Sequence, residues 1–108
     1  MKTVRQTMED MPGTFVPEAA AGVNEVYQFD IAGEDGLQWY AVVKDCQCTV
    51  TEGRHDKPSL TITMGAKDYV DMAEGRLNGQ VAFMTRRMKL TGDMLHALKM
   101  NKIFKRKS

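Results

Sequence analysis

Hydrophobic and polar residues alternate through the first half of the chain. Tyr27, Phe29 and Ile31 alternate with Gln28 and Asp30, and this period of two predicts a strand with one buried face. Further strands are expected over 37–44, over 46–50 with Cys46, Cys48 and Val50 on one side, and over 60–64 with Leu60, Ile62 and Met64 inward. Turn residues at 32–36 and a tight connection at 45–46 favour an antiparallel meander of the first three strands, and a polar loop follows at 53–58.

From Gly65 the hydrophobic period changes to that of a helix. Apolar positions at 66, 69, 70 and 73 predict one helix between Gly65 and Gly75, and Leu77, Val81 and Met84 form an i, i+4, i+7 stripe on a second. Residues 87–91 alternate again, which places the side chains at 88 and 90 inward. A last helix is expected after Asp93, running through Met94, Leu95 and Leu98 with an extension to Ile103 and Phe104.

Strands first, then helices, then a returning strand predict the α+β class, with helices on one face of a mainly antiparallel sheet. The 108 residues are expected to form a single domain. Residues 1–22 would hold a short helix over 4–11, ending before Pro12, and a connector. Residues 23–104 would form the core, and 105–108 a basic tail.

Composition indicates a globular protein, with 43% hydrophobic and 27% charged residues. The longest apolar run, 39–43, is far short of the roughly 20 residues of a transmembrane helix. The first residues lack the apolar stretch of a secretory signal, and two cysteines are too few for a disulfide framework. We therefore expect a cytoplasmic location.

Charge and methionine are both unevenly used. Residues 86–108 carry eight cations against Asp93 alone, a net +7, which points to an anionic membrane surface or nucleic acid unless it is simply a solvated tail. No groove-reading or RNA-binding motif accompanies these cations, so nucleic acid is not expected. Nine methionines against six leucines indicate an adaptable core, or a cavity that accepts several ligands.

Catalytic and metal-binding motifs are missing from the sequence. Two serines and two histidines form no recognisable triad, and no phosphate-binding glycine loop occurs. Cys46 and Cys48 have only His55 nearby in sequence, whereas a closed zinc site needs four ligands. We expect no metal, no cofactor and no enzymatic activity, and interpret both cysteines as small core residues.

Two neighbouring segments resemble the lipid-binding domain of the sterol carrier protein 2 (SCP-2) family. They read Glu74-Gly75-Arg76-Leu77-Asn78-Gly79-Gln80-Val81-Ala82-Phe83-Met84 and Met88-Lys89-Leu90-Thr91-Gly92-Asp93. Upstream, 27–31, Gly36, Trp39 and the strand at 60–62 follow the family's order, so the resemblance covers roughly 23–104. It implies a five-stranded sheet covered on one face by helices, with an apolar tunnel between the layers. The family usually has glycine where Cys46 and Arg86 stand.

The resemblance implies non-enzymatic binding and transfer of a fatty acid, fatty acyl-CoA or sterol-like lipid. The residues expected to line the ligand site lie on faces predicted to point inward: Tyr69, Leu77, Val81, Met84, Met88, Met94, Leu98 and Phe104. The residues expected to contact an anionic membrane transiently are Lys102, Lys105, Arg106 and Lys107. The alternative is an accessory or subunit domain that uses the same fold for protein interaction or as a homodimer.

Overall fold

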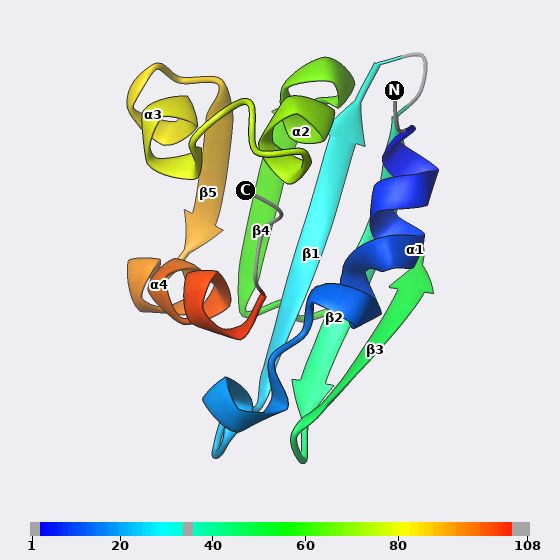
Figure 1. Ribbon diagram of the computed structural model, residues 1–108, viewed down its shortest axis with the longest axis vertical. Coiled ribbons are helices and arrows are strands. Elements are labelled where there is room, and N and C mark those ends of the chain that lie inside the picture. Colours follow the sequence, from blue (N-terminus) through cyan, green and yellow to red (C-terminus); the bar gives the residue numbers. More distant parts are fainter. Residues whose placement is uncertain (1–2, 34–35, 105–108) are drawn as a thin grey trace.

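A five-stranded sheet in the order β3-β2-β1-β4-β5 forms the back of the molecule (Figure 1). Its strands are β1 Glu25–Ala32, β2 Leu37–Lys44, β3 Gln47–Glu52, β4 Leu60–Gly65 and β5 Met88–Gly92. Three neighbouring pairs are antiparallel, and the central pair β1 and β4 is parallel. The mainly antiparallel α+β class expected from the sequence is confirmed. The computed structural model describes residues 3–33 and 36–104.

The parallel pairing arises because β4 joins the sheet on the far side of β1 from β2. The chain leaves β3 at one edge and must cross two strands before β4 starts. Gln28 holds this crossing segment: its Nε2 donates to the Gly53 carbonyl at 3.1 Å, and its Oε1 accepts from the His55 backbone N–H at 2.8 Å. The amide is completely buried as a result. The alternation of strand residues placed Gln28 away from the core but gave no sign of the segment that covers it.

All the helices lie on one face of the sheet (Figure 1). They are α1 Val4–Thr14, the 3₁₀-helix η1 Pro17–Ala20, α2 Ala66–Ala73, α3 Gly79–Met84 and α4 Met94–Ile103. The expectation that the first helix ends before Pro12 is wrong, because α1 includes this proline and continues to Thr14. Thr3 and Gln6 form a capping box at its start, with bonds of 3.1 and 2.8 Å, and its buried residues include Met8 and Met11. These interactions offset the backbone bond that a proline removes.

In the described part of the chain, three residues other than glycine have positive φ, and two of them form the turn between β2 and β3. Asp45 has φ 53° and Cys46 has φ 58°, the two left-handed positions of a tight hairpin turn. Cys46 is therefore exposed and outside the strand. The interpretation of Cys46 as a core residue sharing a strand face with Cys48 is wrong. Arg86, at φ 63°, follows the C-terminal end of α3.

The ends of the helical layer are joined across the sheet. The backbone N–H of Val16 donates to the carbonyl of Ile103 at 2.7 Å, and Phe15 forms a β-bridge with Phe104. The rings of Phe15 and Phe104 lie 5.9 Å apart, and Phe104 also meets the edge of Tyr27 at 6.4 Å. The segment after α1 and the end of α4 therefore hold each other over the start of β1.

Candidate functional site

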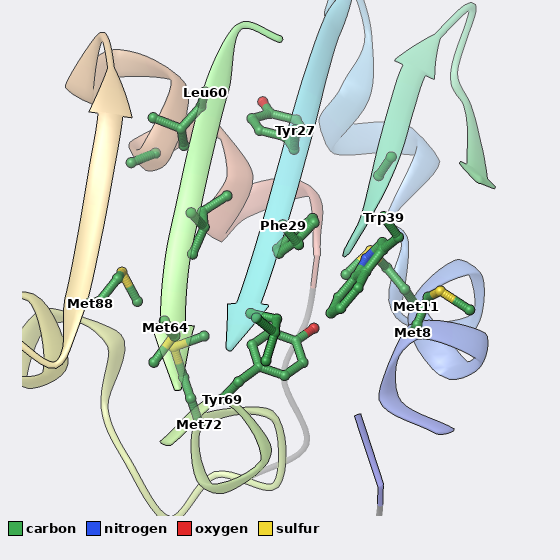
Figure 2. Packing of buried hydrophobic residues seen from close by; sticks show 14 of the residues in the cluster. Met8, Met11, Tyr27, Phe29, Trp39, Leu60, Met64, Tyr69, Met72 and Met88 are labelled. Atoms are coloured by element: carbon green, nitrogen blue, oxygen red, sulfur yellow. The ribbon is translucent and has the colours of Figure 1, made fainter. Parts of the chain in front are cut away.

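The inner face of the sheet and the helices enclose an apolar layer (Figure 2). Phe29 of β1 and Trp39 of β2 are partners in register, and their rings stack at 4.9 Å. Tyr69 of α2 meets Trp39 edge-on at 5.3 Å and closes this aromatic cluster from the helical side. Aromatic contacts of this kind add to the free energy gained by burying the rings.

Methionine is the other prominent residue of the layer. Figure 2 shows Met8 and Met11 of α1 beside Trp39, Met64 and Met72 near Tyr69, and Met88 on β5. All five are buried. An unbranched thioether changes shape at little cost in free energy. Methionine side chains from α1, α2, β4 and β5 can therefore adjust to apolar groups of different shape.

The layer also contains two polar donors without a hydrogen-bond partner. Neither the Tyr27 hydroxyl nor the Trp39 indole N–H has one, although both side chains are completely buried. Burial, together with the nearby charge of Glu25, raises the pKa of Tyr27 to about 12. Unpaired buried donors are uncommon in folded proteins. Both can donate to a polar group that enters the layer.

The structure divides the residues predicted to line the ligand site into three groups. Tyr69 and Met88 are buried in the apolar layer. Leu77 and Phe104 are partly buried and pack against the core. The inward orientation expected for the rest is wrong, because four side chains are exposed: Val81, Met84, Met94 and Leu98. Their role in ligand binding stays a prediction.

The exposure of these four residues has a common cause, which is the face that α3 and α4 turn towards the sheet. The buried residue of α3 is Ala82, one position after Val81, and one position turns a helix face by about 100°. In α4 the buried residues are Ala97 and Ile103 rather than the larger side chains of its first turn. Alanine lets a helix backbone approach its neighbour closely. The size of the apolar side chains in the pattern did not reveal this preference.

Two side chains of α4 lie close to the carboxylate of Glu25 at the start of β1. Glu25 lies 3.3 Å from His96 Nδ1 and 3.6 Å from Lys99 Nζ. Lys102, on the last turn of α4, is exposed, whereas Lys105, Arg106 and Lys107 lie outside the described residues.

The described residues contain no cluster of three or more His, Cys, Asp or Glu that could hold a metal ion. Cys48 is half-buried, and burial raises the pKa of its thiol to about 11. An open depression of about 500 Å³ lies between the β1–β2 connection and the end of β3, lined by residues such as Leu37 and Gly53. None of the predicted ligand residues lines it. No helix in the described part of the chain combines the length and apolarity needed to cross a bilayer.

Comparison with known proteins finds similarity over nearly the whole chain. Residues 13–105 match the SCP-2 sterol transfer family. Hydroxysteroid dehydrogenase-like protein 2 of Rattus norvegicus is 30% identical over 101 residues, which cover 93% of this chain and 19% of that protein. The chain thus spans about a fifth of the length of this curated relative.

Solved structures of similar fold include two sterol carrier proteins from insects. The sterol carrier protein domain 2 of Helicoverpa armigera superposes with a TM-score of 0.71 at 29% identity, over 90% of this chain and 81% of that one. Palmitated SCP2L2 from Aedes aegypti superposes with a TM-score of 0.72 at 23% identity, over 92% and 91% of the two chains.

Proposed function

The chain belongs to the SCP-2 sterol transfer family, and from this premise we propose that it binds a long-chain lipid and transfers it without chemical change. The ligand would be a fatty acid, a fatty acyl-CoA or a sterol-like molecule. It would lie between the sheet and the helices, in the tunnel that the resemblance implies. Family membership supports lipid binding in general, and the choice among these ligands belongs to the proposal.

The observation that carries this proposal is the methionine-rich apolar layer. Five buried methionines from four different elements belong to this layer, together with the aromatic cluster. Each methylene of an acyl chain gains about 0.8 kcal/mol on leaving water, so a chain of some 16 carbons offers on the order of 12 kcal/mol before ordering costs. The flexible thioethers would let the layer part around such a chain and close again after its release.

A displacement assay tests this proposal on the purified protein. Palmitate is a suitable first competitor for a fluorescent fatty acid, since the Aedes aegypti structure is of a palmitated protein. We expect palmitate to displace the probe at micromolar concentration. Absence of both probe binding and displacement, with the protein folded by circular dichroism, would overturn the proposal.

Two neighbouring residues of β5 provide a matched pair of variants. Met88 faces the layer and is buried, whereas Lys89 faces away and is exposed. Met88→Gln places an amide against the ligand and should weaken binding about tenfold, in line with the 1–3 kcal/mol cost of an unpaired buried polar group. Lys89→Gln should leave the affinity in solution unchanged. Equal affinities of the two variants for fatty acid would show that Met88 does not contact the ligand.

We propose further that the basic C-terminal segment speeds exchange of the ligand with anionic membranes. Lys102, Lys105, Arg106 and Lys107 follow Leu98 within a short stretch of sequence. Each cation near an anionic surface contributes about 1 kcal/mol of attraction, and salt screens it. Changing Lys105, Arg106 and Lys107 to Gln should slow transfer to anionic vesicles while the solution affinity stays the same. An unchanged rate of transfer to anionic vesicles at low salt would show that the segment is only a solvated tail.

A second candidate function is that of an accessory domain, with the same fold used for protein contact. The observation in its favour is that the matched region makes up only 19% of the rat relative. In that protein a domain similar to this chain is part of a much longer polypeptide. Light scattering after size exclusion distinguishes the two functions when combined with the displacement assay. A stable homodimer that binds no fatty acid would favour the accessory role.

A further inference from the structure

Among residues 3–33 and 36–104, six large hydrophobic side chains are exposed, and all six belong to α3 and α4. They are Val81, Phe83 and Met84 of α3, and Met94, Leu95 and Leu98 of α4, with exposed fractions from 42% to 73%. The two helices lie beside opposite ends of the edge strand β5, on the helix-covered face (Figure 1). β5, a strand of five residues, connects α3 to α4 along the chain. Apolar side chains gathered on one margin of a soluble fold commonly mark an interaction surface.

Cations accompany these apolar side chains. Arg86, Arg87 and Lys89 are exposed between the two helices, and Lys99 and Lys102 are exposed on α4. Asp93 is the one acidic residue in the sequence from 77 to 104, so this stretch has a net charge of +4. Lys99 lies 3.6 Å from Glu25, whereas the three cations beside β5 form no ion pair among those found in the described residues.

We propose that α3, β5 and α4 form a docking surface for an anionic lipid bilayer, called here the β5 margin and defined by the six exposed apolar residues with Arg86, Arg87 and Lys89. This proposal rests on the proposed lipid-carrier function and names the partner with which the ligand is exchanged. The apolar side chains would enter the region between headgroups and acyl chains, and the cations would meet lipid phosphates and carboxylates.

Charge decides between a bilayer and the other candidate occupants. A second copy of the chain placed on this margin would bring Arg86, Arg87 and Lys89 of both copies together, and like charges at an interface are unfavourable. A nucleic acid would satisfy the cations but would leave the six apolar side chains against phosphates and water. An anionic bilayer satisfies both sets of side chains at once.

The position of the margin also suits lipid exchange. Met88, which is buried in the apolar layer, is the first residue of β5 and lies between α3 and the rest of the strand. A protein docked by this margin therefore presents the β5 side of its layer to the membrane. A ligand leaving on that side would reach the acyl-chain region by a short path.

Flotation with vesicles tests the proposal on the full chain. The vesicles contain phosphatidylcholine alone or phosphatidylcholine with phosphatidylserine. We expect the unmodified protein to float with the anionic vesicles only, and salt to reduce the bound fraction. Absence of binding to anionic vesicles at low salt, or equal binding to both kinds, would overturn the proposal.

Two sets of variants separate this surface from general electrostatic attraction. Changing Arg86, Arg87 and Lys89 to Gln should weaken vesicle binding by roughly tenfold to a hundredfold, at about fivefold per charge. The matched control changes three exposed lysines on other elements, Lys44, Lys57 and Lys67, to Gln, and should bind nearly as the parent does. Equal losses in the two triple variants would overturn the proposal.

The apolar contribution is tested with Phe83→Gln combined with Leu95→Gln, two exposed residues outside the predicted ligand site. We expect vesicle binding to fall about tenfold while the affinity for fatty acid in solution stays the same. Unchanged vesicle binding would contradict the docking role of α3 and α4. A dimer in solution that this double variant dissociates would assign the margin to a second copy instead. Loss of fatty acid binding by the parent protein would speak against the proposed function and not against the docking surface.

Discussion

Tyr27 carries a buried hydroxyl without a partner, and its removal has a predictable effect. The pKa of Tyr27 is raised from 10.0 to about 12 in the folded protein. The neutral form is therefore favoured by folding: its stabilising contribution is complete below pH 10 and is lost as the pH rises towards 12. At neutral pH we expect the free energy of unfolding of Tyr27→Phe, measured in urea, to equal that of the parent or to exceed it by up to about 1 kcal/mol. Above pH 10 the variant should lose less stability than the parent. Destabilisation at neutral pH would show that the hydroxyl has a partner.

The two cysteines should differ sharply in reactivity. Cys46 is exposed in its turn, whereas Cys48 is half-buried with a thiol pKa of about 11. Because the thiolate is the reactive form, a maleimide at mildly alkaline pH should label Cys46 first and Cys48 only slowly. Mass spectrometry of the labelled protein measures both rates, with Cys46→Ser as the control. Similar rates at the two sites would contradict the burial of Cys48.

Single residues were predictable where a local pattern determines them. The alternation around Phe29 and Trp39 placed both rings inward, and they stack there. The burial of Gln28 was not predictable, since it depends on a loop 25 residues away. The sequence does not show that Cys46 lies in a turn, because a small apolar residue suits a strand as well, and the backbone at φ 58° distinguishes the two.

At the scale of elements, the positive φ angles of Cys46 and Arg86 mark two positions where the backbone favours glycine. A side chain in the left-handed region costs roughly 1 kcal/mol relative to glycine. Cys46→Gly and Arg86→Gly should each raise the free energy of unfolding by about this amount, measured in urea. Arg87→Gly is the matched control, since Arg87 has no positive φ, and it should not stabilise the protein. Equal effects at 86 and 87 would contradict this explanation.

The positions of the helices and strands are largely predictable from the sequence. Which strands pair, and what a helix packs against, are less predictable. All five strands and the helices after β4 occur near the positions that periodicity predicted. The side of the sheet on which β4 enters was not predictable, because pairing across the parallel β1–β4 ladder leaves no local mark in the sequence. The continuation of α1 through Pro12 depends on packing of Met8 and Met11 against the sheet, a tertiary effect that overrides local propensity.

At the scale of the whole molecule, the sequence predicted the class of the fold and the apolar layer, but not which apolar residues would stay outside it. Leu98 and Met84 have the size and spacing of core residues, and the structure exposes them because Ala97 and Ala82 take the contact positions. The net charge of +7 over residues 86–108 makes an anionic partner an expectation from charge alone. The apolar part of the β5 margin depends on the fold, because α3 and α4 lie at the same edge of the sheet (Figure 1).

Mass spectrometry of an organic-solvent extract tests the central claim most directly, since it asks what the purified protein carries before any ligand is chosen. We predict a long-chain fatty acid or a similar amphiphile in amounts comparable with the protein, and its depletion once the protein has been delipidated by unfolding and then refolded. Re-addition of palmitate to the refolded protein should restore one bound chain. An extract free of lipid, from folded protein that also takes up no palmitate, would contradict the claim that this fold serves here as a lipid carrier.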